Sequence, residues 1–114
     1  MITVDPHSAT PPYEQVREQI RAQVLSGELV PGTKLPTVRR LADDLALATN
    51  TVARAYRELE ALGVIETRGR AGSVVTGGGV ERVAREAARD YVDRLKALGL
   101  DEAGAVELVR RAYG

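Results

Sequence analysis

Apolar residues recur at every third or fourth position in five stretches of the chain, separated by glycine and proline. This spacing places the apolar side chains on one face and predicts amphipathic α-helices. The segments between them are rich in residues that end helices or form turns. We therefore expect five helices, at about 13–25, 38–45, 50–62, 80–98 and from 102 to near the C-terminus.

The second and third predicted helices carry clear end signals. Thr37 follows Pro36 and is a natural N-cap for the second helix, and either Thr49 or Asn50 is expected to cap the third. Gly63 ends the third helix. The expected core positions of the first three helices are Tyr13, Val16, Ile20 and Val24, then Val38, Leu41, Ala42 and Leu45, then Val52, Ala55, Tyr56, Leu59 and Leu62.

Two short runs rich in β-branched residues follow the third helix, at 64–67 and 73–76. The loop between them, at 68–72, contains glycine and arginine, so the two runs predict a hairpin with a basic tip. Helix, turn, helix and hairpin in this order are typical of a winged helix-turn-helix. The expected fold class is mainly α with a small β-hairpin, followed by two C-terminal helices, and the layout indicates DNA binding.

Three consecutive glycines, at 77–79, divide the chain. We interpret them as a flexible linker. Residues 1–76 then form the winged helix-turn-helix domain, and residues 80–114 form a helical tail. The proline-containing segment 1–12 is expected to be extended or loosely ordered.

Charge and composition narrow the picture further. The 16 basic and 16 acidic residues give a net charge of zero, but 45–57 and 68–72 each contain two arginines and no acid. Local positive patches of this kind suit DNA binding with modest non-specific affinity. The chain lacks cysteine, its first dozen residues do not resemble a signal peptide, and it has no apolar run long enough to cross a membrane.

The outer face of the third helix has the chemistry of a recognition helix. Helical spacing places Asn50, Arg54 and Arg57 opposite the core positions, with Ala53 and Ala61 beside them. Asparagine pairs bidentately with adenine, and arginine pairs with guanine or phosphate. The alternative is an ordinary solvated helix face, but the helix-turn-helix and wing favour DNA.

Further arginines lie where a winged helix meets the DNA backbone. Arg39 and Arg40 follow the N-cap of the second helix, and Arg68 and Arg70 lie in the wing. The alternative for Arg39 and Arg40 is pairing with Asp43 and Asp44, four residues further along the same helix. The alternative for the wing is a loop with no partner.

Over about residues 11–76, the sequence resembles the GntR family of bacterial transcription regulators. The matching segments are Pro12-Tyr13-Glu14-Gln15-Val16, Leu25-Ser26-Gly27-Glu28-Leu29, Pro31-Gly32-Thr33-Lys34-Leu35-Pro36, Arg39-Arg40-Leu41-Ala42 and Leu59-Glu60-Ala61-Leu62-Gly63-Val64-Ile65. Asn50-Thr51-Val52, the run Arg54-Ala55-Tyr56-Arg57-Glu58-Leu59-Glu60, the opening Ile2-Thr3-Val4-Asp5-Pro6 and the short two-helix tail resemble its YtrA subfamily.

The resemblance implies a cytoplasmic homodimeric repressor that binds an inverted-repeat operator in double-stranded DNA. It also suggests control by a small-molecule effector, with repression set by protein concentration alone as the alternative. In the family, an arginine at the position of Arg39 contacts DNA, and polar residues at the start of the recognition helix contact bases. The expected DNA-binding residues are Arg39, Arg40, Thr49, Asn50, Thr51, Arg54, Arg57, Arg68 and Arg70.

The chain departs from the family pattern in three places. Ala46 replaces the usual turn glycine, so we expect the turn to avoid a left-handed residue there. Ala48-Thr49 replaces a more polar pair. The wing sequence Arg68-Gly69-Arg70-Ala71-Gly72 has its second and third residues exchanged relative to the family pattern.

The tail is too short for a separate ligand-binding domain, and its broad apolar face needs a partner. Pairing with the same helices of a second chain would cover this face and would present two recognition helices to two half-sites. The alternative is that the helices fold back on their own winged domain. The residues expected at the dimer interface are Val80, Val83, Ala84, Ala87, Tyr91, Leu95, Leu98, Leu108 and Val109.

The sequence argues against an enzyme. His7 is the only histidine and lies in the N-terminal segment, and the adjacent acids Asp43 and Asp44 point apart on a helix. The glycines at 77–79 lack the lysine and hydroxyl residue of a phosphate-binding loop. We therefore expect no metal and no cofactor. A winged helix used for protein–protein contact is the remaining alternative to DNA binding.

Overall fold

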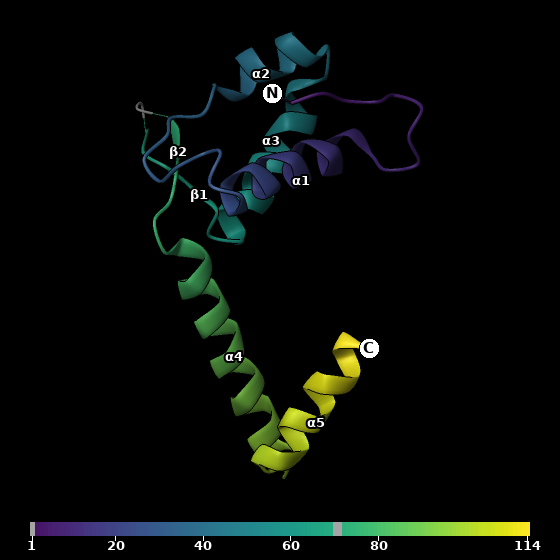
Figure 1. Ribbon diagram of the computed structural model, residues 1–114, viewed down its shortest axis with the longest axis vertical. Coiled ribbons are helices and arrows are strands. Elements are labelled where there is room, and N and C mark those ends of the chain that lie inside the picture. The colour runs from purple at the N-terminus through teal and green to yellow at the C-terminus, as the bar shows by residue number, and fades with distance from the viewer. Residues whose placement is uncertain (1, 70–71) are drawn as a thin grey trace. The chain divides into compact units, whose positions relative to one another are not determined.

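The computed structural model describes residues 2–69 and 72–114. In this part of the chain there are five helices and one antiparallel hairpin (Figure 1). The chain divides into two compact units, Met1–Glu81 and Arg82–Gly114. In chain order the elements are α1 (Pro12–Leu25), α2 (Val38–Leu45), α3 (Thr49–Ala61), β1 (Ile65–Thr67), β2 (Ser73–Val75), α4 (Gly79–Ala97) and α5 (Glu102–Tyr113).

The core of the first unit lies around α3, which packs against both α1 and α2. The expected apolar stripes supply it: Val16, Ile20, Val52 and Leu59 are completely buried. The prediction that Leu62 faces the core is wrong. Leu62 follows the last residue of α3 and is 41% exposed. The helix ends there because Gly63 adopts a left-handed conformation (φ 76°), which turns the chain toward β1 before Leu62 can reach the core.

The turn between α2 and α3 contradicts one expectation. Ala46 does adopt the left-handed conformation, with φ 55° and ψ 43°. The amide of Leu47 donates to the carbonyl of Ala42 across 2.9 Å, and the amide of Ala46 donates to that of Asp43 across 3.2 Å. These bonds satisfy the last carbonyls of α2 and compensate for the steric cost of a left-handed alanine.

The predicted N-cap of α2 is confirmed, and that of α3 is wrong. The hydroxyl of Thr37 accepts a hydrogen bond from the amide of Arg40 across 3.1 Å, as expected of an N-cap. The third helix is different, because Ala48 occupies its N-cap and offers no side-chain bond. Thr49 and Asn50 are instead the first two residues inside α3, since the turn that starts at Ala46 ends one residue earlier than the sequence indicates.

The hairpin has the expected place, with Ile65 paired to Val75 and Thr67 paired to Ser73. A further segment joins it: a single bridge pairs Lys34 with Val74, and the amide of Leu35 donates to the carbonyl of Ser73 across 2.9 Å. The segment just before α2 therefore lies along the wing. Its proline and glycine predict only a turn, not this pairing.

The N-terminal segment is more ordered than expected. The side chain of Gln19 exchanges two hydrogen bonds with the backbone of Thr3, and the side chain of Gln15 exchanges two with the backbone of Asp5. Ile2 and Val4 pack against the core. The side-chain amides of two glutamines, one helical turn apart on α1, thus bond the backbone N–H and C=O groups of this segment, as a neighbouring strand would. These bonds hold the segment in an extended conformation.

The glycine segment also differs from a simple flexible linker at its last residue. Gly79 is the first residue of α4, and a Cβ there would overlap the carbonyl oxygen of Gly63 and the hydroxyl of Thr76. Thr76 itself donates a hydrogen bond to that carbonyl. Within the first unit, Gly79 therefore lies close to Gly63 and Thr76.

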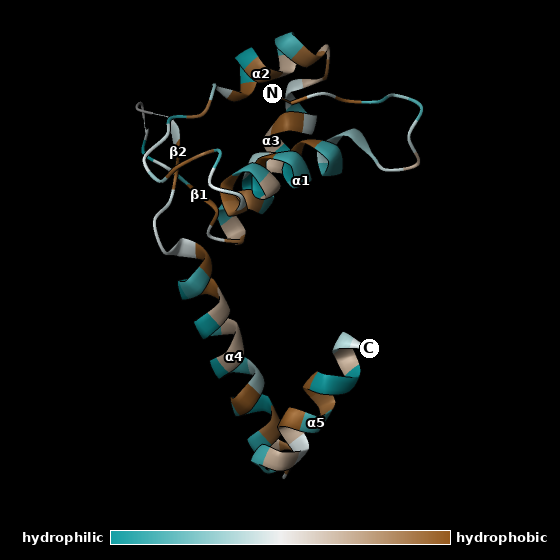
Figure 2. Ribbon diagram, viewed as in Figure 1, coloured by the Kyte–Doolittle hydropathy of each residue, from teal (hydrophilic) through white to brown (hydrophobic). Residues whose placement is uncertain are grey.

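The second unit is a helical hairpin made by α4 and α5. Leu95 is its buried residue, the phenol of Tyr91 donates to the carbonyl of Ala105 across 2.8 Å, and Asp101 caps α5 through the amide of Gly104. Leu98 lies beyond the end of α4 and is 74% exposed, because the left-handed Gly99 begins the turn. Apolar residues recur along both helices (Figure 2). No helix in the described residues is long and apolar enough to cross a membrane.

Candidate nucleic-acid interface

The start of α3 presents polar side chains that the fold itself does not use. Because Ala48 is the N-cap, neither Thr49 nor Asn50 is engaged in capping. Within residues 2–69 and 72–114, no side-chain hydrogen bond or ion pair is made by Thr49, Asn50 or Arg57. All three are exposed. The hydroxyl and the amide at the start of α3, and the guanidinium of Arg57 two turns further along the same helix, are suited to base edges and phosphate.

Arg54 is held more tightly than the sequence indicates. Its guanidinium carbon lies 3.7 Å from the centroid of the Tyr13 ring, which comes from α1. Its Nε donates to Glu58, one helical turn along α3, across 3.0 Å. Tyr13 was expected in the core, but it is half-buried and its ring stacks on this arginine. The recognition face and α1 are thus joined through a cation–π contact.

Glu58 pairs with Arg17 as well as with Arg54. Arg17 of α1 donates to Glu58 across 2.5 Å and also contacts Glu14 across 3.3 Å. The hydrogen bonds from Arg17 and Arg54 lower the pKa of Glu58, and the bond to Glu58 raises the pKa of Arg17. Glu58 therefore remains ionised at neutral pH, and its charge is compensated by the two arginines that flank it.

The first turn of α2 contributes Arg39 and Arg40. Together with Thr37, Asp43 and Asp44 they line a shallow recess on the surface. Arg40 lies 4.0 Å from Asp44, a weak exposed pair, whereas Arg39 makes no ion pair with any residue in the described ranges. The alternative pairing proposed for Arg40 is present, and that for Arg39 is not. Arg39 is free to meet a phosphate beside the helix N-terminus.

The wing has one described arginine and one lysine that the sequence reasoning missed. Arg68 donates to Glu66 across 2.6 Å and remains largely exposed. Arg70 lies outside the described residues. Lys34 is paired with Val74 through the backbone, and its side chain passes beside Gly72 at the wing. The sequence places Lys34 just after a Pro-Gly turn and gives no sign that it lies near the wing. Only the pairing with Val74 brings it there.

The first unit is a winged helix-turn-helix DNA-binding domain. It has two adjacent helices, α2 and α3, an exposed polar start on α3, and a hairpin after α3. The family model for bacterial regulatory proteins of the gntR family matches residues 12–75. The chain therefore belongs to the GntR family. It is a transcription regulator of the YtrA type, and its relatives are helix-turn-helix regulators, not enzymes.

Two relatives show how far the similarity extends. The HTH-type transcriptional regulator Rv1152 of Mycobacterium tuberculosis is 44% identical over 106 residues, which cover 92% of this chain and 88% of the relative. The HTH-type transcriptional repressor YtrA of Bacillus subtilis is 52% identical over 71 residues, covering 61% of this chain and 55% of the repressor. The similarity to Rv1152 thus includes the tail.

Solved structures agree with the fold. YtrA from Sulfolobus acidocaldarius, a GntR-family transcription factor, has a TM-score of 0.68 at 32% identity and covers 98% of this chain and 96% of its own. The DNA-binding domain of AraR in complex with operator ORX1 has a TM-score of 0.57 at 27% identity, covering 64% of this chain and 90% of its own. The second of these is a DNA-binding domain in complex with an operator.

Proposed function

We propose that this protein is a transcriptional repressor that binds an inverted-repeat operator as a homodimer. The name of the Bacillus subtilis relative, a repressor, and the operator complex of AraR support this proposal. A dimer seated on its operator would occupy the DNA that RNA polymerase needs. Because its target is chromosomal DNA, we place the protein in the cytoplasm.

The observation that carries the proposal is the set of free polar groups at two helix starts. Arg39 lies in the first turn of α2, and Thr49 and Asn50 are the first residues of α3. Polar groups without protein partners at helix N-termini suit phosphate and base edges. In the proposal, Arg39 and Arg40 bind the backbone, Thr49, Asn50 and Thr51 contact bases, and Arg57, Arg68 and Arg70 add charge.

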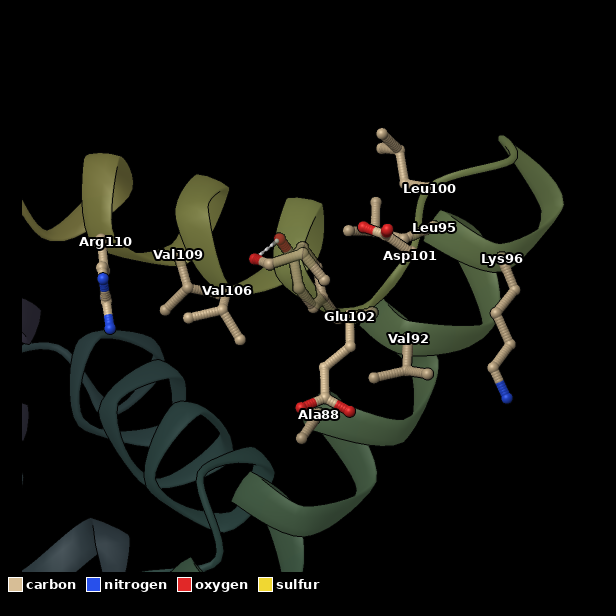
Figure 3. Close-up of a pocket in the computed structure, with 12 residues that line it drawn as sticks. Ala88, Val92, Leu95, Lys96, Leu100, Asp101, Glu102, Val106, Val109 and Arg110 are labelled. Carbon is tan, nitrogen blue, oxygen red and sulfur yellow. Dashed lines mark hydrogen bonds between the residues drawn. The ribbon is translucent and has the colours of Figure 1, made fainter.

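The dimer is proposed from the second unit. A groove of about 520 Å³ lies between α4 and α5, and Figure 3 shows Val92, Val106 and Val109 along it. Val92, Val106, Leu108 and Val109 are each more than one-third exposed. Apolar surface of this kind gains free energy when a second copy covers it. A two-fold dimer places two recognition helices on two half-sites.

Sedimentation of the full chain tests the dimer. Val109→Asp puts a charge into the groove and should convert a dimer of about twice 12.3 kDa into a monomer. Ala103→Asp adds the same charge to α5 outside the groove and should leave the dimer intact. A 12.3 kDa particle for the unaltered chain at micromolar concentration would exclude the proposed dimer.

Selection of bound sequences from random duplex DNA, at stated salt, tests the operator. The proposal predicts enrichment of a two-fold inverted repeat whose half-sites are about one or two helical turns apart. No enrichment by the folded protein would exclude sequence-specific binding by this chain alone. We propose that a small-molecule effector controls this binding, with repression set by protein concentration alone as the alternative. A thermal-shift screen in which no metabolite stabilises the protein would favour the alternative.

A further inference from the structure

We propose that Tyr13 is a positioning residue for DNA binding, which holds the guanidinium of Arg54 ready to bind a backbone phosphate. The inference rests on the proposed DNA-binding function and extends it to α1, an element outside the helix-turn-helix. It assigns a role to a contact between α1 and α3 that no other part of the mechanism uses.

Two contacts fix the guanidinium of Arg54. One face of its guanidinium lies against the Tyr13 ring at 3.7 Å from the centroid, and its Nε is bonded to Glu58 at 3.0 Å. A planar guanidinium held at one face and one edge has lost most of its rotational freedom. The entropy that an arginine normally loses on binding DNA has therefore been lost already on folding.

The terminal nitrogens of Arg54 remain available to a ligand. The side chain of Arg54 is 54% exposed, and its two terminal nitrogens make no hydrogen bond within the part of the chain that the structure describes. Four N–H groups are thus available in a fixed fork. This fork matches the oxygens of a phosphate and binds them in a bidentate manner.

The position of Arg54 and the charges around it also suit a phosphate. Arg54 lies one helical turn after Asn50 on the outer face of α3, toward α1. An arginine at the flank of a recognition helix is beside the DNA backbone when the helix start is at the bases. Glu58 does not repel the phosphate strongly, because Arg17 shares its carboxylate with Arg54 and compensates its charge. Tyr13 then acts through Arg54 and does not itself touch DNA.

The experiment is a double-mutant cycle measured on the selected operator over a range of salt. Arg54→Gln should weaken binding about tenfold and reduce the slope of log K against log salt by about 1, as expected for one lost phosphate contact. Tyr13→Leu should weaken binding about two- to fivefold in the unaltered chain and have no further effect in the Arg54→Gln chain. Tyr13→Phe keeps the ring and should bind like the unaltered protein.

Two outcomes would overturn the inference. An unchanged salt slope in Arg54→Gln would mean that Arg54 binds no phosphate. A full effect of Tyr13→Leu in the Arg54→Gln background, or an effect on the melting temperature alone, would make Tyr13 a structural residue only. Failure of the unaltered protein to select any operator would overturn the proposed function itself, and is therefore distinguishable from both.

Discussion

The phenol of Tyr56 donates a hydrogen bond across 2.7 Å to the backbone carbonyl of Pro36, the residue before the N-cap of α2. Tyr56 is buried on α3, so this bond links the recognition helix to the start of the helix before it. The two helices that carry the proposed DNA contacts are thus fixed to each other by one side chain as well as by their apolar faces.

Tyr56→Phe should cost about 0.5–1.5 kcal/mol of stability near neutral pH, because a buried hydrogen bond is lost. Burial raises the pKa of Tyr56 to about 12, so the folded state resists ionisation of the phenol. The unaltered protein should therefore lose stability as the pH rises from about 10 to about 12, and Tyr56→Phe should lack this component. Urea unfolding at several pH values measures it; parallel pH profiles would contradict the assignment.

Ala46→Gly should stabilise the protein by about 0.5–1 kcal/mol. Ala46 has a left-handed backbone, which costs alanine more than glycine, and this gain exceeds the entropy that glycine adds to the unfolded chain. Thermal or urea unfolding provides the measurement. Ala53→Gly, within α3, is the control and should destabilise by about 1 kcal/mol, since its backbone is right-handed helix. Equal signs for both variants would refute the argument.

Gly79→Ala should destabilise the first unit by about 1–3 kcal/mol. The new methyl group would overlap the backbone carbonyl of Gly63, which has little freedom to move. Gly77→Ala is the matched control, because a methyl group there would meet Pro31 only at an ordinary 3.6 Å. Denaturant midpoints that fall equally for the two variants would show that α4 does not start against Gly63.

Arg39→Ala should weaken operator binding by about 1–3 kcal/mol, the size of one good contact. Arg39 is exposed, and no ion pair in the described residues depends on it, so folding should be unaffected. Arg21→Ala, in α1, removes an equal charge from a residue paired with Glu18 and should change affinity little. Titration of labelled operator at fixed salt gives both values, and an unchanged affinity for Arg39→Ala would remove it from the interface.

Lys34→Ala should weaken binding to all duplexes by a similar factor, because a lysine beside the wing meets phosphate and reads no base. The slope of log K against log salt should fall by about 1. Comparison of operator and random duplex over a salt series gives the measurement. Loss of affinity for the operator alone would mean that Lys34 contacts bases.

The sequence by itself determined the helices, their order and the family. Period and capping act between residues one turn apart, so the stripe of α2 and the cap at Thr37 follow from neighbouring residues alone. The exposed arginines of α2 and α3 were also predictable, since helical spacing decides which face a residue occupies.

Tertiary structure decided the features that depend on residues distant in the chain. The left-handed Ala46 exists because the packing of α2 against α3 requires that turn, at a cost that local preference would avoid. Tyr13 reaches Arg54 and Lys34 reaches the wing only when α1 and β2 are in place. Such contacts have no local signal, because their free energy arises from packing between elements and not from the preference of any single residue.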